Sequence, residues 1–210
     1  MTTLCHIRDR LQAHRPERVG REHLAQASVA VVLRDAPSGP EIVFIERARR
    51  DGDPWSGQMA FPGGRMESGD PTSRAAAERE TFEEVGVSLA GADHLGLLAE
   101  LQGNPRFERS RLVVSAHIYH VTDPAPFVLE QREVHDALWF PLAELLDPER
   151  HVEYRSPRAA NGSFPGIVVG EPDRQVVWGL TYHFVDLFLQ AIDRPLPDRW
   201  QPVGEFRLRL

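Results

Sequence analysis

Residues 63–87 have the sequence GGRMESGDPTSRAAAERETFEEVGV, and this segment indicates the fold more strongly than any other part of the chain. It begins with a glycine pair, continues through a turn-rich stretch and acquires helical character over residues 72–87. Asp70 followed by Pro71 suits a helix N-cap with proline at the first helical position. The segment is therefore predicted to be a loop that leads into a helix.

Three glutamates of this predicted helix share one face. At about 100° per residue, Glu80, Glu83 and Glu84 fall within an arc of roughly 100°, whereas Phe82 and Val85 lie on the opposite side. Like charges at this spacing repel, and they sit at the C-terminal end of the helix, where the macrodipole is already negative. A cation held among the carboxylates would offset both penalties.

Carboxylate oxygens on one face are the ligands that Mg²⁺ or Mn²⁺ prefers, and a backbone carbonyl and waters can complete the octahedron. Gly63 and Gly64 carry no side chains, so the main chain can approach such an ion closely. Arg79 lies one step round the helix from Glu83 and can hold a carboxylate in a bidentate fork. The alternative interpretation is a solvated acidic helix face without an ion.

These residues resemble the signature of the Nudix hydrolases, Gly-x5-Glu-x7-Arg-Glu-U-x-Glu-Glu-x-Gly-U, in which U is a bulky apolar residue. Gly64 begins the match, and the helical part RETFEEVGV keeps the spacing of the family. The chain departs from the signature in three places. Asp70 stands where the family has Glu, eight residues rather than seven precede Arg79, and Thr81 occupies an apolar position.

Two further stretches resemble the coenzyme A diphosphatase branch of this family. Residues 57–64, GQMAFPGG, follow Arg47-Ala48 and are similar to the upstream signature of the branch, whose members share the extra residue in the Nudix motif. Residues 177–181, VWGLT, resemble the tryptophan-glycine step that opens the last helix in that branch. The resemblance covers about residues 29–192. The loop 49–56 differs, since it lacks a second arginine at the expected spacing and is one residue longer.

The resemblance implies an α+β fold of the Nudix type, an α/β/α sandwich with a mixed β-sheet and a loop-helix-loop motif. It implies metal-dependent hydrolysis of a diphosphate that links a nucleoside to another group. For coenzyme A or acyl-coenzyme A the products would be adenosine 3',5'-bisphosphate and (acyl-)4'-phosphopantetheine. A Nudix diphosphatase acting on ADP-ribose, dinucleotides or nucleoside triphosphates is the alternative, and a nucleotide-binding module without catalysis is the third. Family analogy also allows a homodimer.

The metal site is expected to use Glu80 and Glu84, together with Glu83 and the carbonyl of Gly64. Arg79 is expected to orient these carboxylates rather than to bind phosphate. Removal of a proton from water needs a further carboxylate or one of these three, and Glu133 and Glu83 both remain candidates for this base.

Arginines are the candidates for contacting the phosphates of a substrate. Arg47 and Arg65 are favoured because they flank the motif, while Arg106, Arg109 and Arg111 are further candidates. A solvated surface arginine is the alternative for each of them.

Outside the motif, short β-branched runs predict strands, and residues 28–33 and 42–45 are expected to pair antiparallel across a turn-rich loop. The other predicted strands cover residues 94–101, 112–121, 137–140 and 167–169. Helices are predicted at residues 2–14 and 180–192, and regular βαβ alternation is missing. One Nudix domain is expected over residues 1–210, with a core at about 27–192 and a tail at 193–210.

Composition excludes several other classes of protein. All 24 basic residues are arginine, so Schiff-base chemistry and a P-loop with its lysine are excluded. Cys5 is the only cysteine, which excludes an intramolecular disulfide and a cysteine-built zinc site. A net charge of -7 argues against a general nucleic-acid partner. No stretch has the length or apolar character of a membrane span or signal sequence, so a cytoplasmic location is expected.

Overall fold

A computed structural model describes residues 2–19, 24–53, 55–102, 112–155 and 163–197. Arg106, Arg109 and Arg111, and the predicted tail beyond residue 197, lie outside these residues. The helices are α1 (Leu4–Ala13), α2 (Ser73–Val85) and α3 (Gly179–Ala191), with 3-10 turns η1 (Leu142–Leu146) and η2 (Pro148–Arg150). The strands are β1 (Ala25–Arg34), β2 (Glu41–Arg47), β3 (Met59–Ala60), β4 (Gly63–Arg65), β5 (Asp93–Gln102), β6 (Leu112–His120), β7 (Val134–Pro141), β8 (His151–Arg155), β9 (Ser163–Val168) and β10 (Val176–Trp178).

The larger sheet is mixed, as the resemblance implied. Its path runs β3-β2-β1-β6-β5, while β4 pairs with β1 and β7 pairs with β2. β1 and β6 are parallel, and the other strand pairs of this sheet are antiparallel. The predicted antiparallel pairing of β1 with β2 is confirmed at Leu33 and Ile42.

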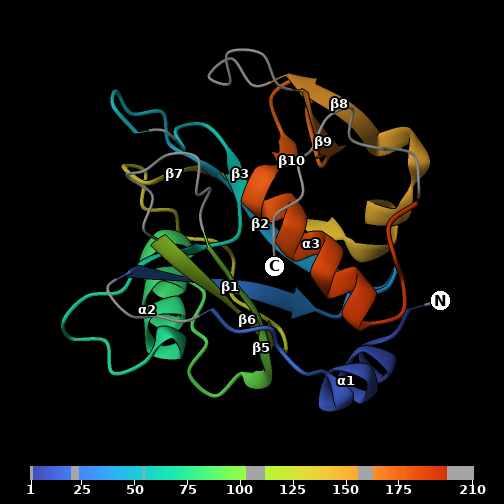
Figure 1. Ribbon diagram of the computed structural model, residues 1–210, viewed down its shortest axis with the longest axis horizontal. Helices are drawn as coiled ribbons and strands as arrows, with labels where there is room; N and C mark the ends of the chain where they lie inside the picture. The colour runs from blue at the N-terminus through green and yellow to red at the C-terminus, as the bar shows by residue number, and fades with distance from the viewer. Residues whose placement is uncertain (1, 20–23, 54, 103–111, 156–162, 198–210) are drawn as a thin grey trace.

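Helices cover both faces of this sheet (Figure 1). Alternate residues of a strand point to opposite faces. Accordingly, Val31 and Leu33 of β1 belong to the core shared with α1 and α3, whereas Ala30 and Val32 belong to the core beneath α2. The predicted α/β/α sandwich is confirmed. No helix among the described residues is both long and apolar enough to cross a membrane.

A second sheet, β8-β9-β10, packs with α3 on one side of the molecule (Figure 1). Only its middle strand overlaps a predicted strand, at residues 167–169, and β9 begins earlier, at Ser163. β8 is short and alternates charged and apolar residues, and β10 is only three residues long. Such short segments carry too little periodicity to be separated from the surrounding loop.

The start of α2 differs from the prediction. Thr72 is the N-cap, and its hydroxyl accepts a hydrogen bond from the backbone N–H of Ala75 at 3.1 Å. Asp70 does not cap the helix because its carboxylate is bound by Arg79. At the other end, Gly86 adopts the left-handed conformation with φ 72°, which glycine takes without strain.

The buried face of α2 is also rotated from the expected one. Ala77, Thr81 and Glu84 are buried together with Val85, whereas Phe82, which was expected opposite the acidic face, is 59% exposed. The hydroxyl of Thr81 donates to the carbonyl of Ala77 at 2.7 Å, so a polar residue fills the apolar motif position with its hydrogen bond made. The rotation brings Glu84 to the centre of the buried face.

Candidate metal and active site

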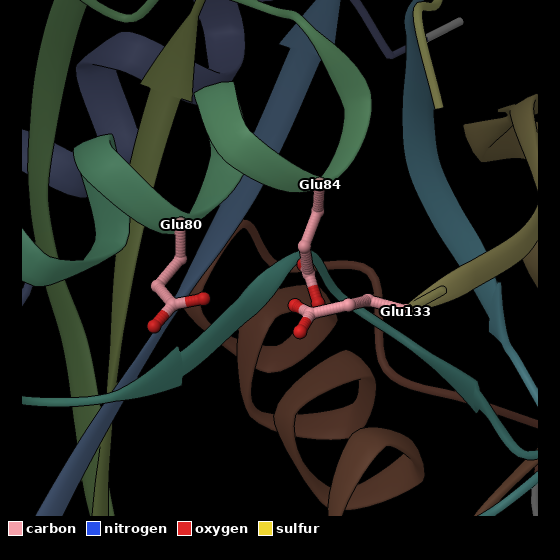
Figure 2. Close-up of side chains that lie close together, drawn as sticks. All are labelled: Glu80, Glu84 and Glu133. Atoms are coloured by element: carbon pink, nitrogen blue, oxygen red, sulfur yellow. The ribbon is translucent and has the colours of Figure 1, made fainter. Parts of the chain in front are cut away.

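Three carboxylates meet where α2 faces the loop before β7 (Figure 2). Glu80 and Glu84 project from α2, one turn apart, and Glu133 directly precedes β7. One carboxylate oxygen from each lies within 4.8 Å of the other two. The group of Glu80, Glu84 and Glu133 is called the carboxylate cluster below.

Glu84 is the most buried member of the cluster, with 2% of its surface exposed. Its Oε2 accepts a hydrogen bond from the backbone N–H of Gly63 at 2.8 Å. Burial raises the pKa of Glu84 to about 8, although this hydrogen bond and the positive charge of Arg47 act in the opposite direction. Burial also raises the pKa of Glu80. A bound cation would favour the charged form of both groups.

The main chain at Gly64 lies directly against Glu80. A Cβ built on Gly64 would lie 2.5 Å from the Cδ atom of Glu80, so only glycine fits at this position without displacing the carboxylate. Gly63 has φ 150°, and a Cβ there would collide with the backbone of Ser28 and Val29. The glycine pair therefore brings the main chain beside Glu80 of the carboxylate cluster.

Arg79 ties α2 to the loop that precedes it. Its Nε donates to Asp70 Oδ1 at 3.1 Å and its Nη2 to Asp70 Oδ2 at 2.9 Å, which is a bidentate fork. The same guanidinium donates to Glu80 at 3.0 Å, to Glu83 at 2.9 Å and to the carbonyl of Arg65 at 3.2 Å. These contacts leave Arg79 in position to orient Glu80. The sequence predicts that Asp70 caps the helix, but its carboxylate is bound by the guanidinium of Arg79 instead.

Glu83 lies outside the carboxylate cluster. Its side chain is 52% exposed and pairs with Arg79. The three glutamates do not all face one site, because the buried face of α2 is centred on Glu84 and turns Glu83 outward. Glu133, which comes from a distant part of the sequence, takes the third place in the cluster.

The two candidate phosphate ligands are placed differently. Arg47 ends β2 and contacts Asp53, with 3.3 Å between Nη2 and Oδ2. Its Nε is buried and has no hydrogen-bond partner among the residues that the structure describes. A buried N–H donor without a partner can bind an anionic ligand. Because the carboxylate cluster lies close by, such a ligand would bind together with a cation. Arg65 is exposed at the end of β4.

The segment after β2 holds Glu133 in place. The sequence does not predict this contact, although it names Glu133 as a candidate. Ala48 donates its backbone N–H to the carbonyl of Glu133 at 2.8 Å, and Arg50 forms an ion pair with the Glu133 carboxylate at 3.7 Å. The arginine-rich sequence RARRD at residues 47–51 was the available signal, but nothing in it identified the partner.

The donor set fits a hard divalent cation. Three carboxylates within reach of one another, one of them buried beside main chain, provide the oxygen ligands that such a cation prefers. Without an ion, the mutual repulsion and desolvation of these groups would be unfavourable.

Comparison with known proteins agrees with this geometry. A family model, the NUDIX domain, matches residues 24–160. The peroxisomal coenzyme A diphosphatase ndx-8 of Caenorhabditis elegans is 34% identical over 128 residues, which are 60% of this chain and 52% of the worm protein. An uncharacterized protein of Schizosaccharomyces pombe, C14C4.10c, is 35% identical over 136 residues, 62% of this chain and 41% of the yeast protein. The chain thus spans roughly half the length of these two relatives.

Other relatives match over nearly their whole length. The uncharacterized Nudix hydrolase NudL of Salmonella heidelberg (strain SL476) is 28% identical over 198 residues, 92% of this chain and 97% of NudL. Among solved structures, a MutT/nudix family protein from Enterococcus faecalis superposes with a TM-score of 0.56 at 16% identity, covering 92% of this chain and 70% of that one. This likeness shows the fold. Because the family model covers more than half of the chain, and the motif supplies Glu80 and Glu84 of the carboxylate cluster, the protein belongs to the Nudix hydrolase family.

Proposed function

We propose that this protein hydrolyses a nucleoside-linked diphosphate with the help of a divalent metal, and that coenzyme A or acyl-coenzyme A is its substrate. The carboxylate cluster beside Gly64 carries the proposal of metal-dependent hydrolysis. The GQMAFPGG segment and the name of the worm relative support the choice of substrate. The products would be adenosine 3',5'-bisphosphate and (acyl-)4'-phosphopantetheine.

In this proposal, Glu80 and Glu84 hold Mg²⁺ or Mn²⁺ with the carbonyl of Gly64. When bound, such an ion lowers the pKa of water and polarises a phosphoryl oxygen. Arg79 holds the Glu80 carboxylate in place through its 3.0 Å hydrogen bond. Arg47, whose Nε has no partner within the described part of the chain, and Arg65 bind the phosphates of the substrate.

We assign the general base to Glu133. Its carboxylate belongs to the cluster, so it can take the proton of a water held there. Glu83 is the competing candidate, but its carboxylate lies outside the cluster, where Arg79 holds it at 2.9 Å. Glu133→Gln should lower kcat by about 100-fold or more, the contribution typical of a general base, whereas Glu83→Gln should keep most of kcat. A loss of that size in Glu83→Gln alone would reverse the assignment.

Mass spectrometry of the products tests the choice of substrate. Coenzyme A, ADP-ribose, NADH and a nucleoside triphosphate are each incubated with the protein and Mg²⁺ or Mn²⁺. Adenosine 3',5'-bisphosphate from coenzyme A is expected. AMP, or a monophosphate with pyrophosphate, from the other compounds would identify a different Nudix diphosphatase, an outcome that the divergent loop 49–56 favours. Binding without products would indicate a non-catalytic module.

Location and assembly are part of the same proposal. We place the protein in the cytoplasm, and the worm relative, named as peroxisomal, supplies the competing location. Homodimerisation also stays a prediction. Imaging of the tagged protein tests the first expectation, and light scattering of the purified protein tests the second.

A further inference from the structure

A buried carboxylate lies on the back of the strand that delivers Arg47. Glu46 is 2% exposed, and its Oε2 accepts hydrogen bonds from Arg174 Nε at 3.2 Å and Gln175 Nε2 at 3.2 Å. The Nη2 of Arg174 is 3.1 Å from the same oxygen. Gln175 Nε2 also donates to Asp136 Oδ2 at 3.2 Å. Arg174 and Gln175 thus join the turn before β10 to both β2 and β7.

This turn is held in shape by its own hydrogen bonds. Gln175 donates its backbone N–H to the carbonyl of Glu171 at 2.8 Å, and its side-chain oxygen accepts from the backbone N–H of Glu171 at 2.9 Å. Val169 donates to the carbonyl of Gln175 at 2.9 Å. A Cβ on Gly170 would overlap the Gln175 side chain, so any larger residue there would displace it. The two side chains that reach Glu46 are therefore presented by a closed turn.

Successive residues of β2 place this contact directly behind the active site. Phe44 belongs to the core shared with α3, whereas Val43 and Ile45 belong to the core beneath α2. By the same alternation, Glu46 faces the α3 side and Arg47 faces the α2 side, where the carboxylate cluster lies. The pairing of β2 with β7 shifts register between Glu46 and Arg47, and Arg47 pairs with Val134 beyond this irregularity.

We propose that Arg174 and Gln175 are positioning residues for the hydrolysis: by clamping Glu46 from behind, they fix the end of β2 so that Arg47 meets the substrate phosphate. This inference rests on the proposed function. A buried carboxylate deprived of its partners moves toward water, and here that movement would carry the next residue with it. The second sheet thereby acquires a role in substrate binding without contacting the substrate.

Steady-state kinetics of Arg174→Met at saturating Mg²⁺ test the clamp. We expect KM for coenzyme A to rise about tenfold, because a small displacement of a positioned group is costly. A smaller fall in kcat is expected, since Glu80 and Glu84 lie on α2 and only Glu133 is bonded to the segment after β2. Gln175→Met keeps the ion pair between Arg174 and Glu46 and should also raise KM. It replaces Arg174→Met as the test if Arg174→Met does not fold.

Arg150→Met provides a matched control. Arg150 pairs with Glu144 and donates to the carbonyl of Val168, so it supports the same second sheet, and among the described residues these bonds do not involve β2. Arg150→Met should lower the melting temperature of the protein and leave KM for coenzyme A unchanged. An unchanged KM in Arg174→Met, or an equal rise in both variants, would overturn the clamp.

Hydrogen exchange separates failure of the clamp from failure of the proposed function. The backbone N–H groups of Arg47 and Ala48 donate to Gln58 and Glu133 at 3.0 Å and 2.8 Å. Arg174→Met should accelerate exchange at these two amides and Arg150→Met should not, whether or not any substrate is cleaved. Absence of turnover in the wild-type protein would defeat the proposed function alone, while unchanged exchange at both amides in Arg174→Met would defeat the clamp.

Discussion

At Gly64 the active site depends on the absence of a single methyl group. The backbone there does not need a positive φ, so alanine is compatible with the chain but not with the Glu80 carboxylate 2.5 Å from the added atom. Gly64→Ala should therefore lower kcat/KM by about 100-fold while the fold is retained, because the Glu80 carboxylate, a proposed metal ligand, is displaced. Activity and circular dichroism measured on the same preparation check this.

Gly69→Ala is the matched control for that substitution. Gly69 lies in the same loop, and a Cβ there would meet nothing within 4 Å. Its activity should equal that of the wild-type protein. Equal losses in the two variants would show that the loop, rather than the contact with Glu80, is at fault.

Glu80→Gln and Glu84→Gln test the two proposed ligands on α2. Each amide keeps the size of the side chain, and the amide oxygen in Glu84→Gln can still accept the hydrogen bond from Gly63. Loss of residues that merely orient ligands costs about 10–100-fold, so loss of a ligand should cost more than about 100-fold in turnover. Exposed Glu153→Gln serves as the control. Near-full activity of either cluster variant at saturating Mg²⁺ would refute the assignment.

The orientation of α2 makes a prediction at the scale of the element. Phe82 is largely exposed, whereas Val85 is buried beneath the helix. Phe82→Ala should change the free energy of unfolding by less than about 0.5 kcal/mol, while Val85→Ala should cost about 2 kcal/mol. Urea denaturation measures both. A comparable loss of stability in Phe82→Ala would mean that Phe82 is buried with Val85, as the hydrophobic pattern suggested.

Glu78 shows why that pattern was misleading. It falls on the side of the helix expected to be apolar, yet it pairs with Arg74 at 2.8 Å and accepts a hydrogen bond from the hydroxyl of Tyr119 at 3.1 Å. Burial and the nearby Glu78 charge raise the pKa of Tyr119, so this hydroxyl stays a donor. Helical periodicity predicts which face of a helix is buried. Contacts with β6, such as that between Tyr119 and Glu78, decide which polar residues can lie at the edge of that face.

The contact between α2, β5 and β6 should respond to pH. His94 and His117 are joined by a 3.2 Å contact between ring nitrogens, and His117 contacts the hydroxyl of Ser73 at 3.0 Å. Burial lowers the pKa of His94 below its usual 6.5, and the charge of Arg74 adds to this. The unfolded chain therefore binds the proton more readily, so stability is full above about pH 6.5 and declines as pH falls toward the folded-state pKa.

His94→Gln should weaken that decline. The difference in melting temperature between wild type and variant is measured from about pH 8 to about pH 5, a range that spans the ordinary histidine pKa. Exposed His135→Gln is the control. Parallel curves for wild type and His94→Gln would show that His94 does not titrate with folding.

For the whole molecule, the sequence predicted the parts of the fold that have strong local periodicity. The long strands, the three helices and the sandwich class follow from β-branched runs, helical spacing and the Nudix resemblance. The second sheet was largely missed, because β8 and β10 are held by pairing with β9 and by α3 rather than by their own sequence. Short strands of this kind depend on tertiary context.

The same distinction holds for the site. Glu80, Glu84 and Arg79 are close in sequence, so helical spacing was enough to group them. Glu133 stood beside Glu83 as an unresolved alternative, since its place depends on how the segment before β7 meets α2. The contacts of Glu46 with Arg174 and Gln175 span more than one hundred residues and had no local signal.

Binding of Mn²⁺, followed by electron paramagnetic resonance of the free ion, tests the carboxylate cluster most directly. The account predicts saturable binding by the wild-type protein and affinity at least about 100-fold weaker for Glu84→Gln, whose carboxylate is the most buried of the three. Equal affinity of the two proteins for Mn²⁺ would contradict it.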